Sequence, residues 1–319
     1  MKMQPRVDLA IILLNWNAAD ETCHLLRRLI TWTHLQPRIY IVDNGSADNS
    51  VEVISAEFPD VEFIRNEKNE GFSGGNNAAL RTIIDSPSNG STFNSSQFLL
   101  LLNNDAFIEE KDLLVLIESL NADPQVGVIG PLLYDGSDFK KLLSAGGLDP
   151  SQNGRTYWAG DDAEDYIERT GKPYEVDYVS GTVALLRNSV VRETGIFDEN
   201  YFFSCEMADL CERLKGNGYK CTINPVARAW HDVHSSPKNR DTLYIYYSLR
   251  NRFLFIRKFR QEKKIRLFCY WMMIGGKGMV KALLLGRLAT VRALFLALRD
   301  GLAGRYGGRN ELFLDKPND

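Results

Sequence analysis

The chain has 319 residues, 44% hydrophobic and 25% charged, which is ordinary for a globular protein and long enough for one large domain or two smaller ones. The net charge of −3 hides an asymmetry: residues 250–309 hold fifteen Lys and Arg residues and two acids, whereas residues 1–249 hold 22 basic and 36 acidic residues. This distribution argues against nucleic acid as a partner, because the acidic part would repel phosphates, and predicts that the basic part meets an anionic surface.

The first hundred residues alternate between strand-like and helix-like segments. Short apolar runs predict strands at 9–14, 38–42, 61–64 and 97–102, and the continuous runs are typical of strands buried on both faces. Helices are predicted at 20–31, at 48–58 with Asp48 as the cap, and at 73–84. This alternation predicts an α/β fold with a mostly parallel central sheet flanked by helices.

The remaining segments are less regular. Residues 86–96 form a polar stretch that we expect to be an exposed loop. Residues 135–178 are rich in Gly and Asp, so we expect long loops with short strands there, where acceptor recognition could lie. Residues 240–309 are basic, aromatic and helical in character, and glycines at 275, 276, 278 and 286 favour two or more short helices over one long helix.

The last helical segment shows a basic amphipathic pattern. On one continuous helix, five cations would fall within an arc of about 140° opposite an apolar side; they are Lys277, Lys281, Arg287, Arg292 and Arg299. Such a pattern suits a helix lying in a membrane interface over anionic lipid. The alternative is that these helices pack on the catalytic domain or on a partner subunit, giving a homo-oligomer.

Cysteine usage and the N-terminus predict the compartment. The five cysteines include no C-x-x-C pair, which indicates reduced thiols in a cytosolic protein. Residues 1–8 carry no apolar signal segment, and no uninterrupted apolar run reaches the ~18 residues of a spanning helix. We therefore expect a cytoplasmic protein associated peripherally with the inner face of the cell membrane.

Polar residues follow each predicted strand, where ligands of open parallel sheets bind. They lie in Asn15-Trp16-Asn17, Asp43-Asn44-Gly45-Ser46 and the stretch 69–77. Glycines there allow close backbone approach, the amides can bond a base or ribose, and Asp43 can accept an N–H from a pyrimidine base. Each piece alone is also a common turn. No G-x-G-x-x-G follows the first strand, which disfavours a dinucleotide site.

Two acidic motifs carry the predicted chemistry. Asp105 ends the run Asn103-Asn104-Asp105 after the fourth strand, where an acid can hold Mg²⁺ or Mn²⁺ that bridges diphosphate oxygens. An Asx turn is the alternative for Asp105. Glu206 and Asp209 lie three residues apart at a predicted helix start, on one helix face, with helix capping as their structural alternative.

These motifs together resemble a family 2 glycosyltransferase of the rhamnosyltransferase-like branch, with the nucleotide-diphospho-sugar transferase (GT-A) fold. The resemblance is carried by residues 12–17, 42–48, 69–76, 102–105, 179–181, 195–202, 206–210 and 218–231, and it weakens after Ser236. It implies a catalytic domain over 1–240, with a nucleotide-binding half at 1–105 and an acceptor and catalytic half at 106–240. A basic helical region over 241–309 and a tail at 310–319 complete the chain.

The resemblance also implies roles for single residues. Asp43 and Asn17 lie near the base and Asn69 and Gly71 border the ribose; the full nucleotide-binding set is Asn15, Asn17, Asp43, Asn44, Asn69, Gly71, Asn76, Asn103 and Asn104. Asn103 and Asp105 occupy the Asp-x-Asp positions of the family, and Asp105 with His231 would hold the divalent cation. His234 is a weaker ligand candidate, and Ser180 and Gly181 are assigned to the sugar or acceptor.

The implied reaction is an inverting transfer of a sugar, such as rhamnose, from a nucleotide-diphosphate donor to a polysaccharide, O-antigen or lipid-linked glycan. The family usually supplies the base as an aspartate in Glu-Asp-x-Asp, but here that position is Met207, whose thioether cannot accept a proton. Three alternatives stay open: Glu206 or Asp209 is the base, the base is another acid such as Asp198 or Glu199, or the chain is an impaired protein that still binds nucleotide sugar. If position 207 is the base site, Met207→Asp raises turnover at least tenfold.

A nucleotidyltransferase is a weaker alternative, because no Gly-rich loop with Lys or Arg lies near the N-terminus.

Overall fold

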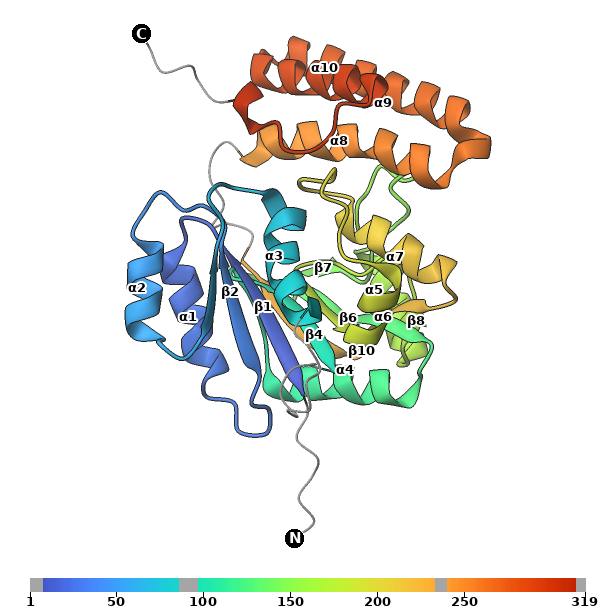
Figure 1. Ribbon diagram of the computed structural model, residues 1–319. Helices are drawn as coiled ribbons and strands as arrows, with labels where there is room; N and C mark the ends of the chain where they lie inside the picture. The colour runs from blue at the N-terminus through green and yellow to red at the C-terminus, as the bar shows by residue number, and fades with distance from the viewer. Residues whose placement is uncertain (1–7, 86–96, 233–239, 314–319) are drawn as a thin grey trace.

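The computed structural model describes residues 8–85, 97–232 and 240–313, which form a mixed central sheet with helices on both faces and a separate helical layer (Figure 1). Four parallel strands make the first half of the sheet: β1 (Leu9–Asn15), β2 (Arg38–Asp43), β3 (Glu62–Arg65) and β4 (Phe98–Asn103). All four predicted strands are therefore present, within one or two residues of their predicted ends.

The second half of the sheet is mixed. β9 (Val183–Arg187) runs antiparallel to both β4 and β6 (Val126–Asp135), and β10 (Lys220–His231) runs parallel to β6. The short strand β5 (Ala106–Ile108) closes the order β3-β2-β1-β4-β9-β6-β10-β5. β7 (Leu142–Ser144) pairs with β6, and β8 (Tyr174–Glu175) pairs with β10.

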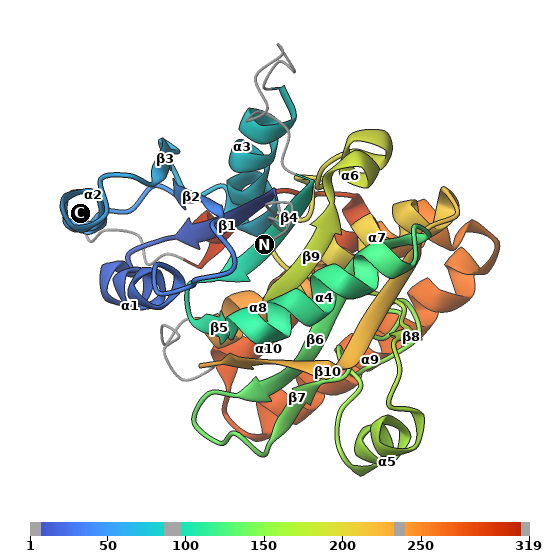
Figure 2. The same ribbon diagram turned by 90° about the horizontal axis from the view of Figure 1, so that it is seen from below.

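Alternating strand residues point to opposite faces of the sheet, which explains why the apolar runs are continuous. Ile11 and Leu13 pack with α1 (Ala19–Leu29), α2 (Ser50–Glu57) and α4 (Glu110–Ala122). Ala10 and Ile12 face α3 (Gly71–Asp85), α6 (Asn188–Thr194) and α7 (Glu206–Gly216) on the other side (Figure 2). Each fully buried Leu or Ile contributes about 1.5–3 kcal/mol of transfer free energy.

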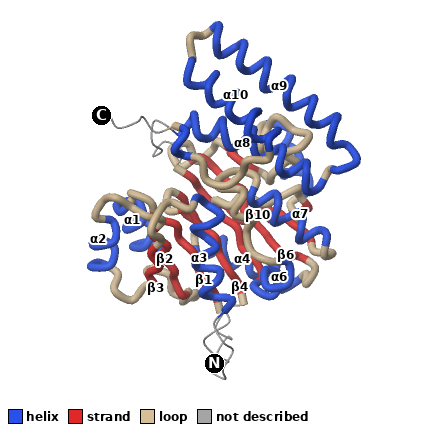
Figure 3. Tube along the Cα trace, turned by 45° about the horizontal axis from the view of Figure 1, so that its top comes forward, coloured by secondary structure: helices blue, strands red, loops and turns tan. Residues whose placement is uncertain are grey.

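Three C-terminal helices form the separate layer: α8 (Arg240–Phe259), α9 (Lys264–Leu284) and α10 (Leu288–Ala303) (Figure 3). They share a core of their own, in which Tyr246, Phe253 and Trp271 are buried with Ala293 and Ala297. Phe202, from the loop before α7, belongs to the same core and stacks on Tyr247 at 5.1 Å. The layer is therefore packed directly against the segment that carries the Glu206 motif.

The C-terminal region forms several helices rather than one long helix, as predicted, but only one of the four glycines lies at a break between them. Gly275, Gly276 and Gly278 lie inside α9, and a Cβ at Gly275 would lie 3.0 Å from Leu298 Cδ2 of α10. Gly275 therefore lets the two helices pack closely. Gly286, with φ of +67°, forms the turn between α9 and α10. Arg292 and Arg299 thus lie on a different helix from Lys277 and Lys281, and the single arc of five cations does not exist.

Other predictions are corrected locally. The segment predicted as loops and short strands contains a helix, α5 (Asp161–Thr170). The N-cap of α2 is Asn49; Asp48 instead accepts a hydrogen bond from the backbone N–H of Ser50. The expected loop at 86–96 lies outside the described residues. Within the described residues one helix, Gln261–Leu284, is long and apolar enough to cross a membrane by length and composition, which alone is weak evidence for a span.

Candidate active site

Asn15 and Asp43 lie side by side at the carboxyl edge of the sheet, because they are register partners at the ends of β1 and β2. The Asn15 amide donates to Asp43 Oδ1 (3.0 Å), and Thr22 donates to Asn15 Oδ1 (2.8 Å). Asn104, after β4, donates to Thr22 Oγ1 (3.1 Å), so three strand ends share one hydrogen-bond network. Asn15 and Asp43 are buried, so this network holds the strand ends in a fixed arrangement at the edge of the sheet.

The loop after β1 is fixed by the turn after β2. Asn17 has a positive φ of 50° and its side-chain oxygen accepts a hydrogen bond from Ala47 N (2.7 Å). Ser46 Oγ accepts from Asn17 N (2.9 Å). Trp16, which precedes Asn17, is 45% exposed.

Asn44 ties β2 to the loop before α3. Its amide nitrogen donates to Asn69 Oδ1 (3.1 Å) and to Gly71 O (3.0 Å), while its oxygen accepts from Asn66 and from the backbone of Glu70. Asn44 is buried, so its hydrogen bonds shape the loop rather than reach into solvent. Asn76 is also buried, inside α3, where its amide donates to Phe72 O (2.9 Å).

The start of α3 docks on the loop that precedes α7. Phe72 N donates to Phe202 O (2.8 Å), and Ser73 Oγ donates to Tyr201 O. A Cβ at Gly71 would lie 2.1 Å from Phe202 O, so only glycine permits this approach. The predicted ribose-side loop and the acidic motif, about 130 residues apart in sequence, are therefore one structural unit.

Asp105 and His231 come together because β5 and β10 pair antiparallel, placing His231 opposite Ala106. His231 Nε2 lies 3.1 Å from Asp105 Oδ1. Both atoms are buried, and their contact with each other is an ion pair when His231 is protonated. A carboxylate oxygen and an imidazole nitrogen this close fit the binding of a divalent cation, which would replace that contact. His234 lies outside the described residues.

A cation at this pair would need further ligands. Across the described parts of the chain, no group of three or more His, Cys, Asp or Glu side chains is arranged to hold a metal. Asn103 N donates to Thr182 O (3.0 Å) at the end of β4, next to β9. Asp105 and Asn104 line a cleft of about 560 Å³ bordered by α1 residues Asp20, Glu21 and His24. The cleft leaves room for substrate oxygens beside Asp105.

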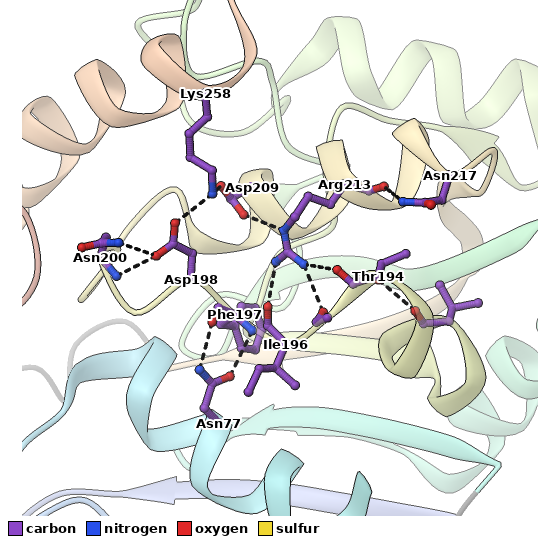
Figure 4. Close-up of polar contacts among 12 residues, drawn as sticks. Asn77, Thr194, Ile196, Phe197, Asp198, Asn200, Asp209, Arg213, Asn217 and Lys258 are labelled. Carbon is purple, nitrogen blue, oxygen red and sulfur yellow. Dashed lines mark hydrogen bonds and ion pairs between the residues drawn. The ribbon is translucent and has the colours of Figure 1, made fainter.

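Asp209 is fully buried and neutralised by two cations (Figure 4). Its Oδ1 accepts from Arg213 Nε (2.9 Å), and its Oδ2 contacts Lys258 Nζ of α8. Arg213 also donates to the backbone carbonyls of Thr194, Gly195 and Ile196. Asp209 therefore holds α7 against α6 and α8, and its carboxylate is already engaged.

The two alternative acids are engaged as well. Asp198 Oδ2 accepts from Lys258 Nζ (2.8 Å); burial alone would raise the pKa of Asp198, but the Lys258 hydrogen bond and charge lower it overall. Glu199 pairs with Arg81 and accepts from Asn77 (2.8 Å). Burial alone would also raise the pKa of Glu199, but these hydrogen bonds lower it overall. Neither acid is a free base.

Glu206 is the exception among these acids. Its Oε2 is buried and has no hydrogen-bond partner in the described segments, and burial raises the pKa of Glu206 to about 7. Met207, next in sequence, points into the core: it is 3% exposed and lies beside Phe72 and Gly181. A carboxyl group with a pKa near neutrality is suited to general-base work.

Ser180 and Gly181 are buried shortly before β9, and Gly181 lies beside Met207. Ser180 Oγ donates to Tyr157 OH (3.2 Å), and a Cβ at Gly181 would lie 2.7 Å from Phe72 Cζ. Burial is the main cause that raises the pKa of Tyr157 to about 12, with a contribution from the Glu206 charge. The Tyr157 hydroxyl is therefore neutral near pH 7 and shares a hydrogen bond with Ser180.

Helix α8, and Arg260 directly after it, make contacts that the sequence does not predict. Arg250 is fully buried, donates to Gly307 O (2.8 Å) and packs on the ring of Tyr247. Asn251 donates to Phe203 O and Ser204 O, directly before Glu206. Arg260 pairs with Asp149 and Glu212. The expectation that these cations face an anionic surface is wrong, because their partners lie within the fold.

The sequence model described as "Glycosyl transferase family 2" matches residues 10–195, more than half of the chain. A curated relative, the N-acetylglucosaminyl-diphospho-decaprenol L-rhamnosyltransferase of Mycobacterium tuberculosis (strain CDC 1551 / Oshkosh), is 23% identical over 242 residues, covering 72% of this chain and 78% of that protein. The low-salt glycan biosynthesis hexosyltransferase Agl10 of Haloferax volcanii is 24% identical over 261 residues, covering 77% and 75%.

The fold is that of solved glycosyltransferases. The mannosyltransferase PcManGT of Pyrobaculum calidifontis, solved in complex with GDP-Man and Mn²⁺, matches with a TM-score of 0.57 and 13% identity, covering 94% of this chain and 88% of that chain. The predicted GT-A architecture with C-terminal helices is thereby confirmed. The acidic motif at 206–209 and His231 lie beyond the residues matched by the family model.

Proposed function

The chain belongs to glycosyl transferase family 2, an enzyme family that uses nucleotide-sugar donors, and on that premise we propose that it transfers its sugar with inversion, with Glu206 as the base. An inverting displacement needs a base within reach of the acceptor hydroxyl, on the face of the sugar opposite the leaving diphosphate. The burial of Glu206 supports this role, as does the electrostatic interaction of its charge with Tyr157, which is hydrogen-bonded to Ser180. The motif position usually occupied by the base is Met207, which cannot serve.

One observation carries the assignment: Glu206 has a carboxylate oxygen without a hydrogen-bond partner among the described residues, whereas the other nearby acids are ion-paired. A base must be free to accept the acceptor proton, and Asp209 is held by Arg213 and Lys258. The raised pKa of Glu206, about 7, matches proton transfer near neutral pH.

Asp105 and His231 are the residues that would hold a divalent cation, Mg²⁺ or Mn²⁺. Their Oδ1 and Nε2 atoms are buried and adjacent, which supports this assignment. When bound, such a cation neutralises charge on the leaving diphosphate. The chain itself orients the donor: the Asn15–Asp43 network fixes the floor beneath the nucleotide, and the Asn44 hydrogen bonds hold the loop at Asn69 and Gly71.

For the finer specificity we propose a lipid-linked glycan as the acceptor and rhamnose as the sugar. The supporting fact is the name of the mycobacterial relative, which specifies L-rhamnose and a decaprenyl diphosphate acceptor. The haloarchaeal relative is named only as a hexosyltransferase, so rhamnose rests on one distant relative. A polysaccharide or O-antigen acceptor is the other outcome of an acceptor screen.

The test compares single-site variants in a donor-turnover assay with a panel of dTDP-, UDP- and GDP-sugars. Glu206→Gln is expected to lower kcat by roughly 10²–10⁴-fold with little change in donor affinity. Met207→Asp is expected to bring no tenfold gain, because its carboxylate would enter the apolar space beside Phe72. A tenfold gain in Met207→Asp, or full activity in Glu206→Gln, would remove Glu206 from the base role.

A second function is favoured by the core position of Met207: a protein that binds nucleotide sugar but turns it over poorly. Such a protein would bind the donor in a calorimetric titration, while donor hydrolysis and sugar transfer would both stay at the background rate. In that case Glu206→Gln changes nothing that can be measured in turnover, and donor binding through the Asp105 region persists.

A further inference from the structure

The outward side of α9 is an apolar surface. Four residues, Leu267, Trp271, Gly275 and Ala282, are buried against the rest of the layer. The opposite side exposes Met273 (48%), Val280 (60%) and Leu284 (82%), and Leu288 (68%) continues the surface after the turn. We call this the α9 surface.

Cations flank the α9 surface and no acid interrupts it. Residues 263–299 contain no Asp or Glu. Exposed cations on or beside α9 are Lys263, Arg266, Lys277, Lys281 and Arg287. Unlike Lys258 and Arg260, none of these five is ion-paired within the described residues. Lys277 and Lys281 border a shallow groove of about 490 Å³ with Val280, Leu284 and Leu285.

The anchoring of α9 decides how this surface can be used. Trp271 Nε1 donates to Ser151 O (2.7 Å), and the Arg252 guanidinium lies 4.0 Å from the Trp271 ring centroid. Gly275 packs against Leu298 of α10. Because α9 is packed along one side against the rest of the fold, only its other side is available to a membrane. Such a helix can lie along a membrane surface, but it does not cross a bilayer as an isolated span. Figure 1 shows α9 and α10 as the outermost layer, on the side away from the N-terminus.

We propose that the α9 surface binds the face of a membrane rich in anionic phospholipid, with α9 lying in the interface. Its exposed apolar side chains enter the boundary between headgroups and acyl chains, and its lysines and arginines contact lipid phosphates. The positive charge favours anionic lipid over a second copy of the chain. Two α9 surfaces packed against each other would bring only like charges together.

Vesicle flotation of the full chain tests the proposal, with phosphatidylcholine vesicles that contain either no anionic lipid or about 30% phosphatidylglycerol. Binding is expected only with phosphatidylglycerol and is expected to weaken with salt. Lys277→Glu/Lys281→Glu should lower the partition coefficient at least tenfold, as should Val280→Ser/Leu284→Ser. All four residues are exposed, so the variants should keep the native fold, which circular dichroism checks.

Matched controls make the same changes elsewhere. Lys111→Glu/Lys140→Glu alters exposed lysines of the acidic part, and Ile30→Ser/Val226→Ser alters exposed apolar residues outside the α9 surface. These controls should bind vesicles like the parent chain. The proposal is overturned by absence of binding at low salt, by equal losses in test and control variants, or by protein that resists extraction with high salt and alkali. A dimer that the α9 variants dissociate, without vesicle binding, also overturns it.

Discussion

The side-chain amide of Asn251 on α8 donates a 2.7 Å hydrogen bond to the backbone carbonyl of Ser204, two residues before Glu206. The same amide donates to Phe203 O at 2.8 Å. Ser204 and Cys205 both have positive φ values, 72° and 70°, a strained conformation for residues with side chains. The C-terminal layer therefore holds the backbone turn that presents the proposed base.

Asn251→Ala should impair catalysis more than donor binding. It removes two buried hydrogen bonds from the turn, and misplacement of Glu206 by about 1 Å can cost roughly 10²-fold in rate. We expect kcat to fall about tenfold or more while KM for the donor changes little. The control is Ser248→Ala on the same helix, whose hydroxyl bonds only Ile245 O within α8. Equal kinetic effects in both variants would show that α8 acts only through general stability.

The strand regions were predictable because their signal is local. The runs at 9–14 and 97–102 are apolar on both faces, and β1 and β4 bury both faces. The strand-end residues were predictable for the same reason, since parallel neighbours end at one edge. The contacts of each polar side chain at this edge could not be predicted. Asn44 and Asn76 were predicted as nucleotide contacts, and in the structure their amides hydrogen-bond backbone carbonyls around α3.

The role of the C-terminal charges could not be predicted, because their partners are distant in sequence. Lys258 meets Asp209 and Asp198, and Arg260 meets Asp149 across 111 residues. From the sequence alone these cations are indistinguishable from Lys277 and Lys281, which are exposed. The helix α5 was missed for a related reason: it begins with Asp161 and Asp162 in a Gly- and Asp-rich region whose composition is typical of loops.

Stability should depend on pH through Glu206. Its pKa is about 7 in the folded protein against an ordinary value of 4.5, so the folded state holds an extra proton between these values. Stability is therefore lost as pH rises from about 4.5 to 7, by a total of about 3 kcal/mol. Glu206→Gln removes this loss and should be more stable than the parent chain at pH 8, measured by urea unfolding at pH 5 and 8.

The matched control for that measurement is Glu212→Gln on the same helix. Burial alone would raise the pKa of Glu212, but hydrogen bonds from Arg260 and Lys215 lower it overall. Its ionised form therefore stabilises the fold above its ordinary pKa, and Glu212→Gln should destabilise the protein at pH 8. The opposite signs of the two variants distinguish the buried free carboxyl from the ion-paired one. Identical pH profiles for Glu206→Gln and the parent chain would contradict the raised pKa.

Donor binding should depend on a divalent cation through Asp105 and His231. Mn²⁺ is expected to tighten calorimetric binding of the preferred nucleotide-diphosphate sugar by tenfold or more, and EDTA should reverse this. Asp105→Ala and His231→Ala should each abolish the Mn²⁺ effect. Asp20→Asn is the control, because Asp20 lines the same cleft but forms no three-ligand metal group with the pair among the described residues. Affinity that is unaffected by Asp105→Ala for every donor tested would exclude this site.

Asp209 should prove structural, in contrast to Glu206. Asp209→Asn leaves Lys258 and Arg213 without their shared buried anion, and removal of one partner from a buried ion pair costs about 3–5 kcal/mol. We expect a lower urea midpoint, with donor affinity and the pH profile of kcat retained in the folded fraction. Glu193→Gln is a suitable comparison, because Glu193 accepts one hydrogen bond from Tyr219 at an exposed site and its loss should cost about 1 kcal/mol or less. If Asp209→Asn instead kept full stability and lost turnover like Glu206→Gln, Asp209 rather than Glu206 would be the acid on which proton transfer depends.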